Sequence, residues 1–288
     1  MTKTELWKFK ADGQGGGAWS VEPPANPSLF DGLIPGEYSA VANTADMGYL
    51  VGGIASGWTE LYRAKNQVLP GMLTFNMKTR LWQNGTIGFS PVGTLIGAEA
   101  AYVPAYGPNG LVVLFGGYSP VVDAEPDITV SPISEFQNLT FFDPQSKKVY
   151  WQATTGDIPP SPRARFCVTG FRSSGAGYDI FMSGGMNQRD KFAYNDAYVL
   201  SLPGFVWTKL PDPPGGPRAE QSCVAVGNRQ VLSIGGTNPY SKQWTDPDPA
   251  PQGLLIFDMT AMQWKDSYDA NAAAYESPEV IKGWYSNG

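Results

Sequence analysis

The chain contains no histidine in its 288 residues, which is the most restrictive feature of its composition. Ser-His-Asp triads, Cys-His pairs and imidazole-ligated metal sites are therefore excluded within this chain. Charged residues are also scarce, at 16%, against a usual value of about 25%. Because the net charge is −6 and no basic stripe exists, we expect no nucleic-acid partner. No run approaches the ~20 apolar residues of a membrane span, and the first residues show no secretory signal.

Glycine, proline and aromatic residues are plentiful by contrast. The chain has 34 glycines and 25 prolines, and aromatic residues make up 13% of it. So many turn-forming residues argue against a helical bundle, and the aromatic content argues against disorder. The composition predicts an all-β chain of short strands joined by many turns.

One sequence unit recurs four times along the chain. In each unit an apolar run ends in Gly-Gly and a tryptophan follows 23 to 35 residues after the first glycine, with the tryptophans 69, 56 and 57 residues apart. The glycine pairs lie at 52–53, 116–117, 184–185 and 235–236, and the tryptophans are Trp82, Trp151, Trp207 and Trp264. Two further extended runs complete each unit, which predicts four-stranded propeller blades.

Packing between blades accounts for both marker residues. Glycines at the end of the second strand let the backbone turn where a side chain would collide with the next blade. A tryptophan on the fourth strand fills the wedge that widens away from the propeller axis.

This pattern resembles the kelch-repeat β-propellers, most closely the fungal kelch-repeat ectodomains of the galactose oxidase/kelch-type propeller superfamily. The resemblance rests on the Gly-Gly runs, the spaced aromatic residues, the Pro-Arg pairs 162–163 and 217–218, and the closing segment 266–288. It covers about residues 5 to 288. It implies that a signal peptide precedes and a membrane anchor follows in longer forms, although this chain shows neither.

The expected fold is an all-β, kelch-type β-propeller with four full repeats plus a half blade, in an incomplete or distorted ring. The propeller is expected over residues 5–268, with a half blade at 5–22 and blades at about 36–90, 97–155, 162–211 and 217–266. Residues 269–288 form a C-terminal extension. An alternative is that this extension helps the half blade to close a five-bladed ring. We favour the incomplete ring.

Enzyme chemistry is not expected. The copper site of galactose oxidase, the best-known enzyme on this scaffold, includes two histidines, which this chain cannot supply. No phosphate-binding loop, paired carboxylates or calcium loop can be recognised. We therefore expect no catalytic residues, no metal and no cofactor.

The two cysteines, Cys167 and Cys223, lie at the same distance after Trp151 and Trp207, on the first strands of successive blades. They either form a disulfide or remain buried thiols, and the bridge is favoured if the protein is secreted. Sequons for N-glycosylation occur at Asn84 and Asn138. Together with the resemblance, these features favour an extracellular or cell-surface location.

The loops between the second and third strands are long and should gather on one face, where recognition is expected. Arginines at the blade entries could present a cationic funnel to a partner, but a structural role is preferred. The candidate binding residues are Trp58, Tyr62, Arg63, Tyr118, Asp123, Arg163, Arg165, Arg189, Arg218, Tyr240 and Trp244.

We therefore expect a non-catalytic interaction module that binds a protein or glycan partner through the long-loop face. One alternative is a carbohydrate-oxidase-like propeller domain that has lost its metal site. Another is a cytoplasmic kelch scaffold of the cell-polarity type, which free thiols and bare sequons would support.

Overall fold

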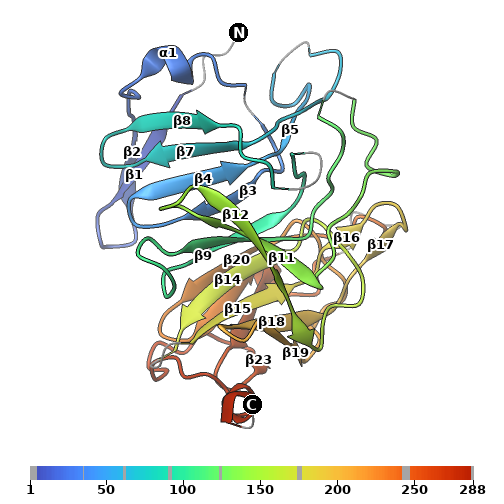
Figure 1. Ribbon diagram of the computed structural model, residues 1–288. Coiled ribbons are helices and arrows are strands. Elements are labelled where there is room, and N and C mark those ends of the chain that lie inside the picture. The colour runs from blue at the N-terminus through green and yellow to red at the C-terminus, as the bar shows by residue number, and fades with distance from the viewer. Residues whose placement is uncertain are drawn as a thin grey trace.

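Four antiparallel four-stranded sheets are arranged as the blades of a propeller (Figure 1). The computed structural model describes residues 5–34, 36–60, 63–89, 93–122, 125–173, 177–241 and 247–286. The predicted kelch-type β-propeller of four repeats plus a half blade is confirmed. Within each blade the strands follow their order in the chain, so the first strand is innermost and the fourth is outermost.

The blades have the following strands. Blade I is formed by β3 (Ala40–Asn43), β4 (Met47–Val51), β7 (Met72–Asn76) and β8 (Leu81–Gly85). Blade II is formed by β9 (Glu99–Val103), β10 (Leu111–Phe115), β11 (Asn138–Asp143) and β12 (Lys148–Ala153). Blade III is formed by β14 (Cys167–Arg172), β15 (Tyr178–Ser183), β18 (Ala197–Leu202) and β19 (Val206–Leu210). Blade IV is formed by β20 (Ser222–Val226), β21 (Gln230–Ile234), β22 (Leu254–Asp258) and β23 (Gln263–Lys265).

Smaller elements decorate the blades. The expected half blade is a two-stranded hairpin, and three further short strands or hairpins and three short helical segments complete the fold. They are β1 (Trp7–Ala11) with β2 (Gly17–Val21), β5 (Ile54–Ala55) with β6 (Gln67–Val68), β16 (Met186–Asn187) with β17 (Phe192–Ala193), β13 (Thr155–Gly156) beside β19, α1 (Pro27–Phe30), the 3-10 helix Pro251–Gly253 and α2 (Glu279–Ser286).

The inner strands place the blades in sequence order. Strand β3 contacts β9, β9 contacts β14, and β14 contacts β20. Over the described ranges, β20 makes no comparable contact with β3, so the four blades form an arc. The expectation of an incomplete ring is therefore confirmed.

An apolar core lies between each pair of neighbouring blades. Tyr49 and Val51 of blade I pack against Val112 and Leu114 of blade II. The next two cores repeat this arrangement, with Trp207 in the core between blades II and III. Because the blades bury both faces only where they have two neighbours, all six residues of β15 and of β18 in blade III are buried.

The glycine pairs follow the second strands, as predicted, and show why a side chain is excluded there. A Cβ atom on Gly52 would collide with the carbonyl oxygen of Leu95 in the next blade, and one on Gly116 would collide with that of Arg163. Both glycines also have positive φ angles, of 63° and 56°, which non-glycine residues rarely adopt.

All four marker tryptophans lie on fourth strands, but only one fills its wedge completely. Trp207 is buried, with Phe115 and Phe136 edge-on to its ring. The Trp151 ring is 64% exposed, contrary to expectation, because the neighbouring Tyr150 instead stacks on Phe141 within the blade.

The two ends of the chain pack at opposite ends of the arc (Figure 1). The segment after β2 joins blade I, where the Asn26 side chain bonds to the backbone of Trp82 at 2.8 and 3.0 Å. The C-terminal extension packs across blades III and IV, where the Tyr275 hydroxyl donates to Asp179 at 2.7 Å and the Asn228 side chain donates to the carbonyl of Ala272 at 2.6 Å. The extension therefore does not meet the hairpin, and the five-bladed alternative is wrong.

Candidate binding face

The loops between second and third strands emerge on one side of the arc, at the right of Figure 1 where β5, β16 and β17 are labelled. We call this side the long-loop face and define it by residues 54–69, 118–136, 186–194 and 237–252, so far as they are described. Short hairpins, β5–β6 and β16–β17, stiffen two of these loops at their base.

In blade III, Arg163 contacts residues at both ends of the long loop. Its side chain is fully buried, and both terminal nitrogens bind the carboxylate of Asp196. Nη1 also donates to the carbonyl of Gly184 at 3.2 Å, and the guanidinium lies 3.7 Å from the centroid of the Tyr194 ring. With its donors directed inward, Arg163 is a packing residue, in agreement with the preferred structural role.

Blade IV repeats this clamp with Arg218. The guanidinium binds Asp248 and donates to the carbonyl of Gly235 at 3.0 Å. Hydrogen bonding from Arg218 lowers the pKa of the Asp248 carboxyl below its ordinary value. The pair borders a polar hollow of about 510 Å³ that Asn238 and Ser241 also line.

Arg165 links three blades near the axis. Its guanidinium lies 3.8 Å from the centroid of the Tyr38 ring in blade I and forms an ion pair with Glu220 in blade IV. Gly97 lies against the Arg165 side chain, since a Cβ atom on Gly97 would be 3.2 Å from Cγ of Arg165. The three arginines at the described blade entries, Arg163, Arg165 and Arg218, are each paired with a carboxylate. This pairing favours the structural role that was preferred over a cationic funnel.

Contacts between successive loops make the long-loop face continuous. Arg189 in blade III donates to the carbonyls of Thr129 and Ser131 in blade II, at 2.8 and 2.6 Å. The hydroxyl of Tyr240 in blade IV donates to the carbonyl of Asn187 in blade III at 3.4 Å. These contacts hold the loops of blades II, III and IV together as one surface.

Tyr118 corrects one expectation. It was predicted to present its ring to a partner, but it is 1% exposed. Its hydroxyl accepts a hydrogen bond from the Gln188 backbone at 2.7 Å, and burial raises its pKa. It therefore belongs to the interior beneath the loops.

The remaining predicted residues divide into three groups. Trp58 is 94% exposed and thus available to a partner. Arg63 is held within its own loop by Glu60 and by Gln67, whose side-chain oxygen lies 2.8 Å from Nη1. Tyr62, Asp123 and Trp244 lie outside the described residues.

Three exposed apolar side chains on this face were missed by the sequence reasoning. Val121 is 60% exposed, Val130 is 73% exposed and Phe192 is 54% exposed. The only signal in the sequence is an apolar residue among polar loop residues, which by itself does not separate exposed from packed side chains. With Trp58, they give the described part of the long-loop face four large exposed apolar groups.

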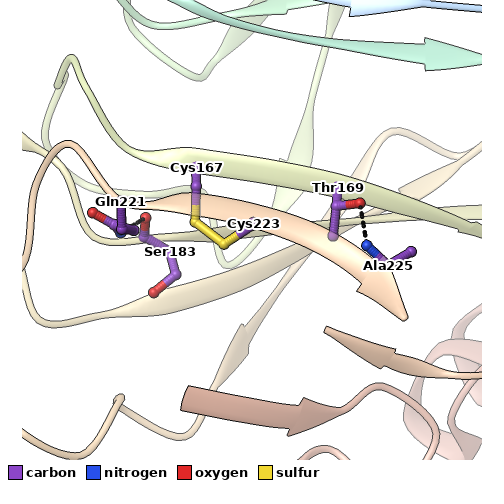
Figure 2. Close-up of a disulfide and its surroundings, with 6 residues drawn as sticks. All are labelled: Cys167, Thr169, Ser183, Gln221, Cys223 and Ala225. Atoms are coloured by element: carbon purple, nitrogen blue, oxygen red, sulfur yellow. Dashed lines mark hydrogen bonds between the residues drawn. A yellow bond between two sulfur atoms is a disulfide. The ribbon is translucent and has the colours of Figure 1, made fainter. Parts of the chain in front are cut away.

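Figure 2 shows the disulfide that joins Cys167 of β14 to Cys223 of β20. Their Cα atoms are 5.3 Å apart, so the bridge ties blade III to blade IV. The same strands are joined by the Ala225 amide, which donates to the Thr169 hydroxyl at 3.1 Å. The cysteines are offset in register, since Cys167 follows the positive-φ residue Arg165 by two positions and Cys223 follows the positive-φ residue Glu220 by three.

The sequon residues Asn84 and Asn138 are both exposed, on β8 and at the start of β11. In the described part of the chain, no three His, Cys, Asp or Glu side chains are placed to hold a metal ion. No described helix has the length and apolar character needed to span a membrane.

The blades and their Gly-Gly turns define the fold as a β-propeller of the kelch type. It is similar to a Kelch repeat-containing protein of Arthroderma benhamiae, with 27% identity over 178 residues. The match covers 59% of this chain and 24% of that protein, so the chain spans about a quarter of the length of this curated relative. No family model matches the chain.

Proposed function

We propose that the protein is a non-catalytic interaction module whose long-loop face binds a protein partner outside the cell. The observation that carries the proposal is a continuous, mutually braced loop surface that exposes Trp58, Val130 and Phe192. Exposed apolar groups on rigid loops are typical of recognition surfaces. Aromatic residues commonly dominate the binding energy at such surfaces.

A role without catalysis is supported by the residues that are already engaged. Both cysteines form a disulfide, so neither supplies a thiolate or a Tyr–Cys crosslink of the oxidase type. The arginines near the axis are paired with carboxylates rather than directed at an open site. The chain also has no histidine for acid–base work.

A photo-crosslinking experiment tests the binding face. A photoreactive phenylalanine analogue replaces Phe192 in the protein expressed in its native host, and a matched control carries it at Val280 of α2, which is similarly exposed at 55%. We expect a defined protein adduct from position 192 that is lost on the additional change Val130→Arg. Equal adducts from both positions, or none from position 192, would contradict the proposal.

A glycan is the alternative partner, and a second experiment tests it. The purified chain would then bind defined oligosaccharides on an array. That binding should fall on Trp58→Ala, because sugars stack on aromatic rings, and remain on Val130→Arg.

The extracellular location is tested by the intact mass of the protein from its native host. We expect a gain of two protons on reduction and a loss of mass on glycosidase treatment, from Asn84 or Asn138. Two free thiols and an unmodified mass would instead favour the cytoplasmic scaffold.

A further inference from the structure

Two backbone hydrogen bonds join each blade to the next, and they recur at equivalent positions. The first involves the positive-φ residue two positions before each inner strand. The amide of Gly97 donates to the carbonyl of Tyr38, that of Arg165 to Gly97, and that of Glu220 to Arg165, each at 2.8 Å. The result is a chain of bonds that runs around the axis from blade I to blade IV.

The second bond involves the second glycine of each pair. The amides of Gly53, Gly117 and Gly185 donate to carbonyls of the following blade, which belong to Leu95, Arg163 and Arg218, at 2.7, 3.0 and 2.7 Å. Each acceptor lies two residues before the positive-φ residue of its blade. The two bonds together constitute a fixed docking pattern between neighbouring blades.

Blade IV offers half of this pattern without a partner. Within the described residues, the carbonyl of Glu220 accepts no hydrogen bond and the amide of Gly236 donates none. A Cβ atom on Gly235 would meet nothing within 4 Å, although Gly235 keeps the positive φ of 66° found at the other pairs. The edge of blade IV is therefore shaped like the edges that receive a neighbour.

Blade I offers the matching half. Among the described residues, the amide of Tyr38 has no acceptor, and the carbonyl of Gly36 has no donor. These two groups stand at the positions that Arg165 and Arg163 occupy in blade III. Blade I therefore presents the donor and the acceptor that the edge of blade IV lacks.

The sheet faces at these two ends are apolar. On the face of blade I turned away from blade II, Val41, Leu50 and Leu73 stand in one register row. This face borders a hollow of about 410 Å³, and Val41 is 54% exposed.

On the face of blade IV turned away from blade III, Val224, Leu232 and Ile256 form a corresponding row. Val224 is 43% exposed, and the neighbouring Ile234 is 41% exposed. Both rows resemble the blade faces that pack together inside the arc.

We propose that the occupant of each end is a second copy of this chain, docked head to tail with its blade I on blade IV of the first. Each copy carries both halves of the pattern, so a two-fold axis along the propeller axis satisfies both edges at once. The assembly has eight blades, within the four to eight found in closed propellers. This site is separate from the long-loop face and does not depend on the proposed function.

The test is the molar mass of the protein in solution, measured by light scattering after size-exclusion chromatography. The sample is the chain with its disulfide intact and its N-glycans removed. Removing glycans matters because Asn84 pairs with Leu73 at the outer end of the blade I row. We expect twice the chain mass. A mass equal to one chain at the highest soluble concentration would overturn the proposal.

Two single substitutions examine the two ends separately. Val41→Arg and Val224→Arg each place a charge on an exposed apolar row, so each variant alone should be monomeric while its circular dichroism remains unchanged. Val130→Arg, on the long-loop face, is the matched control and should leave the dimer intact. A dimer that survives either end substitution would overturn the proposal.

Mixing the two monomeric variants tests the head-to-tail geometry. Blade IV of the Val41→Arg chain and blade I of the Val224→Arg chain are both intact, so the mixture should recover dimers through one interface. If the mixture stays monomeric, the contact is not head to tail. The Val130→Arg variant should lose partner binding at the long-loop face but keep the dimer. Failure of the proposed function and failure of the dimer proposal can therefore be distinguished.

Discussion

Blades III and IV have the same four-stranded plan but differ in burial. All six residues of β15 are buried in blade III, whereas β21 of blade IV ends in the exposed Ile234. The inner strand β14 buries Cys167 and Phe171, while no residue of β20 is fully buried. Blade III has a neighbour on both sides and blade IV on one.

This difference shows that the burial of a blade is set largely by its neighbours rather than by its own sequence. Both blades carry an apolar second strand, a Gly-Gly pair, an Arg–Asp clamp and a fourth-strand tryptophan. Equivalent substitutions in the two blades should therefore lower the free energy of unfolding by unequal amounts. The difference between the two losses reflects the difference in burial between the blades.

The largest contrast is expected between Trp207→Ala and Trp264→Ala. Trp207 is 1% exposed, and removing a buried tryptophan side chain costs about 3–5 kcal/mol. Trp264 is only partly buried, so its removal should cost about 1–2 kcal/mol. Urea unfolding of both variants measures the two values. Equal losses would contradict the account, which ties the cost of each substitution to the burial of its ring.

Opening the disulfide should have the next largest effect, because it is the covalent part of the contact between blades III and IV. The cysteines are 56 residues apart in sequence, and a bridge that closes such a loop typically stabilises a protein by about 2–4 kcal/mol. The double variant Cys167→Ala, Cys223→Ala should lose this amount in urea unfolding. Cys223→Ala alone serves as the control and should lose nearly as much.

The arginine clamps should differ in the same direction. In Arg163→Leu the carboxylate of Asp196, whose side chain is 18% exposed, loses its partner, and we expect a loss of about 2–3 kcal/mol. In Arg218→Leu the carboxylate of Asp248 is 37% exposed and is solvated by water, so about 1 kcal/mol is expected. Thermal unfolding of both variants shows which substitution destabilises the protein more. A larger loss of stability in Arg218→Leu than in Arg163→Leu would contradict the prediction.

A pH dependence, set apart from the blade comparison, arises from Glu99 on β9 in blade II. Burial raises the pKa of its carboxyl to about 8 from 4.5. Between these values the unfolded chain has lost the proton and the folded chain keeps it, so stability falls as pH rises. The slope is at most about 1.4 kcal/mol per pH unit.

Glu99→Gln should flatten this dependence between pH 5 and 8 relative to the unchanged chain. Urea unfolding at several pH values measures it. The control is Glu135→Gln, an exposed carboxyl in the long loop of blade II, which should leave the slope as it is. An unchanged slope in Glu99→Gln would contradict the assignment.

The blades could be predicted from the sequence because their signals are local. Gly52, Gly116, Gly184 and Gly235 each follow an apolar strand, and each tryptophan falls on a fourth strand. The bridge between Cys167 and Cys223 was one of two alternatives, because both residues could be placed on adjacent inner strands but not in their register.

The candidate site was harder to predict because its packing joins residues far apart in the chain. Tyr118 is buried by the loop that carries Gln188, 70 residues later. Arg189 bonds to carbonyls of another blade, around 60 residues earlier. No local pattern distinguishes these residues from Trp58, which has no such neighbour and remains exposed.

Amide hydrogen exchange of the second glycine in each pair tests the blade-docking pattern most directly. The measurement uses the Val224→Arg chain, so that no second copy covers blade IV. We predict slow exchange at Gly53, Gly117 and Gly185, whose amides donate to the next blade, and fast exchange at Gly236. Protection of Gly236 equal to that of the other three would contradict the account.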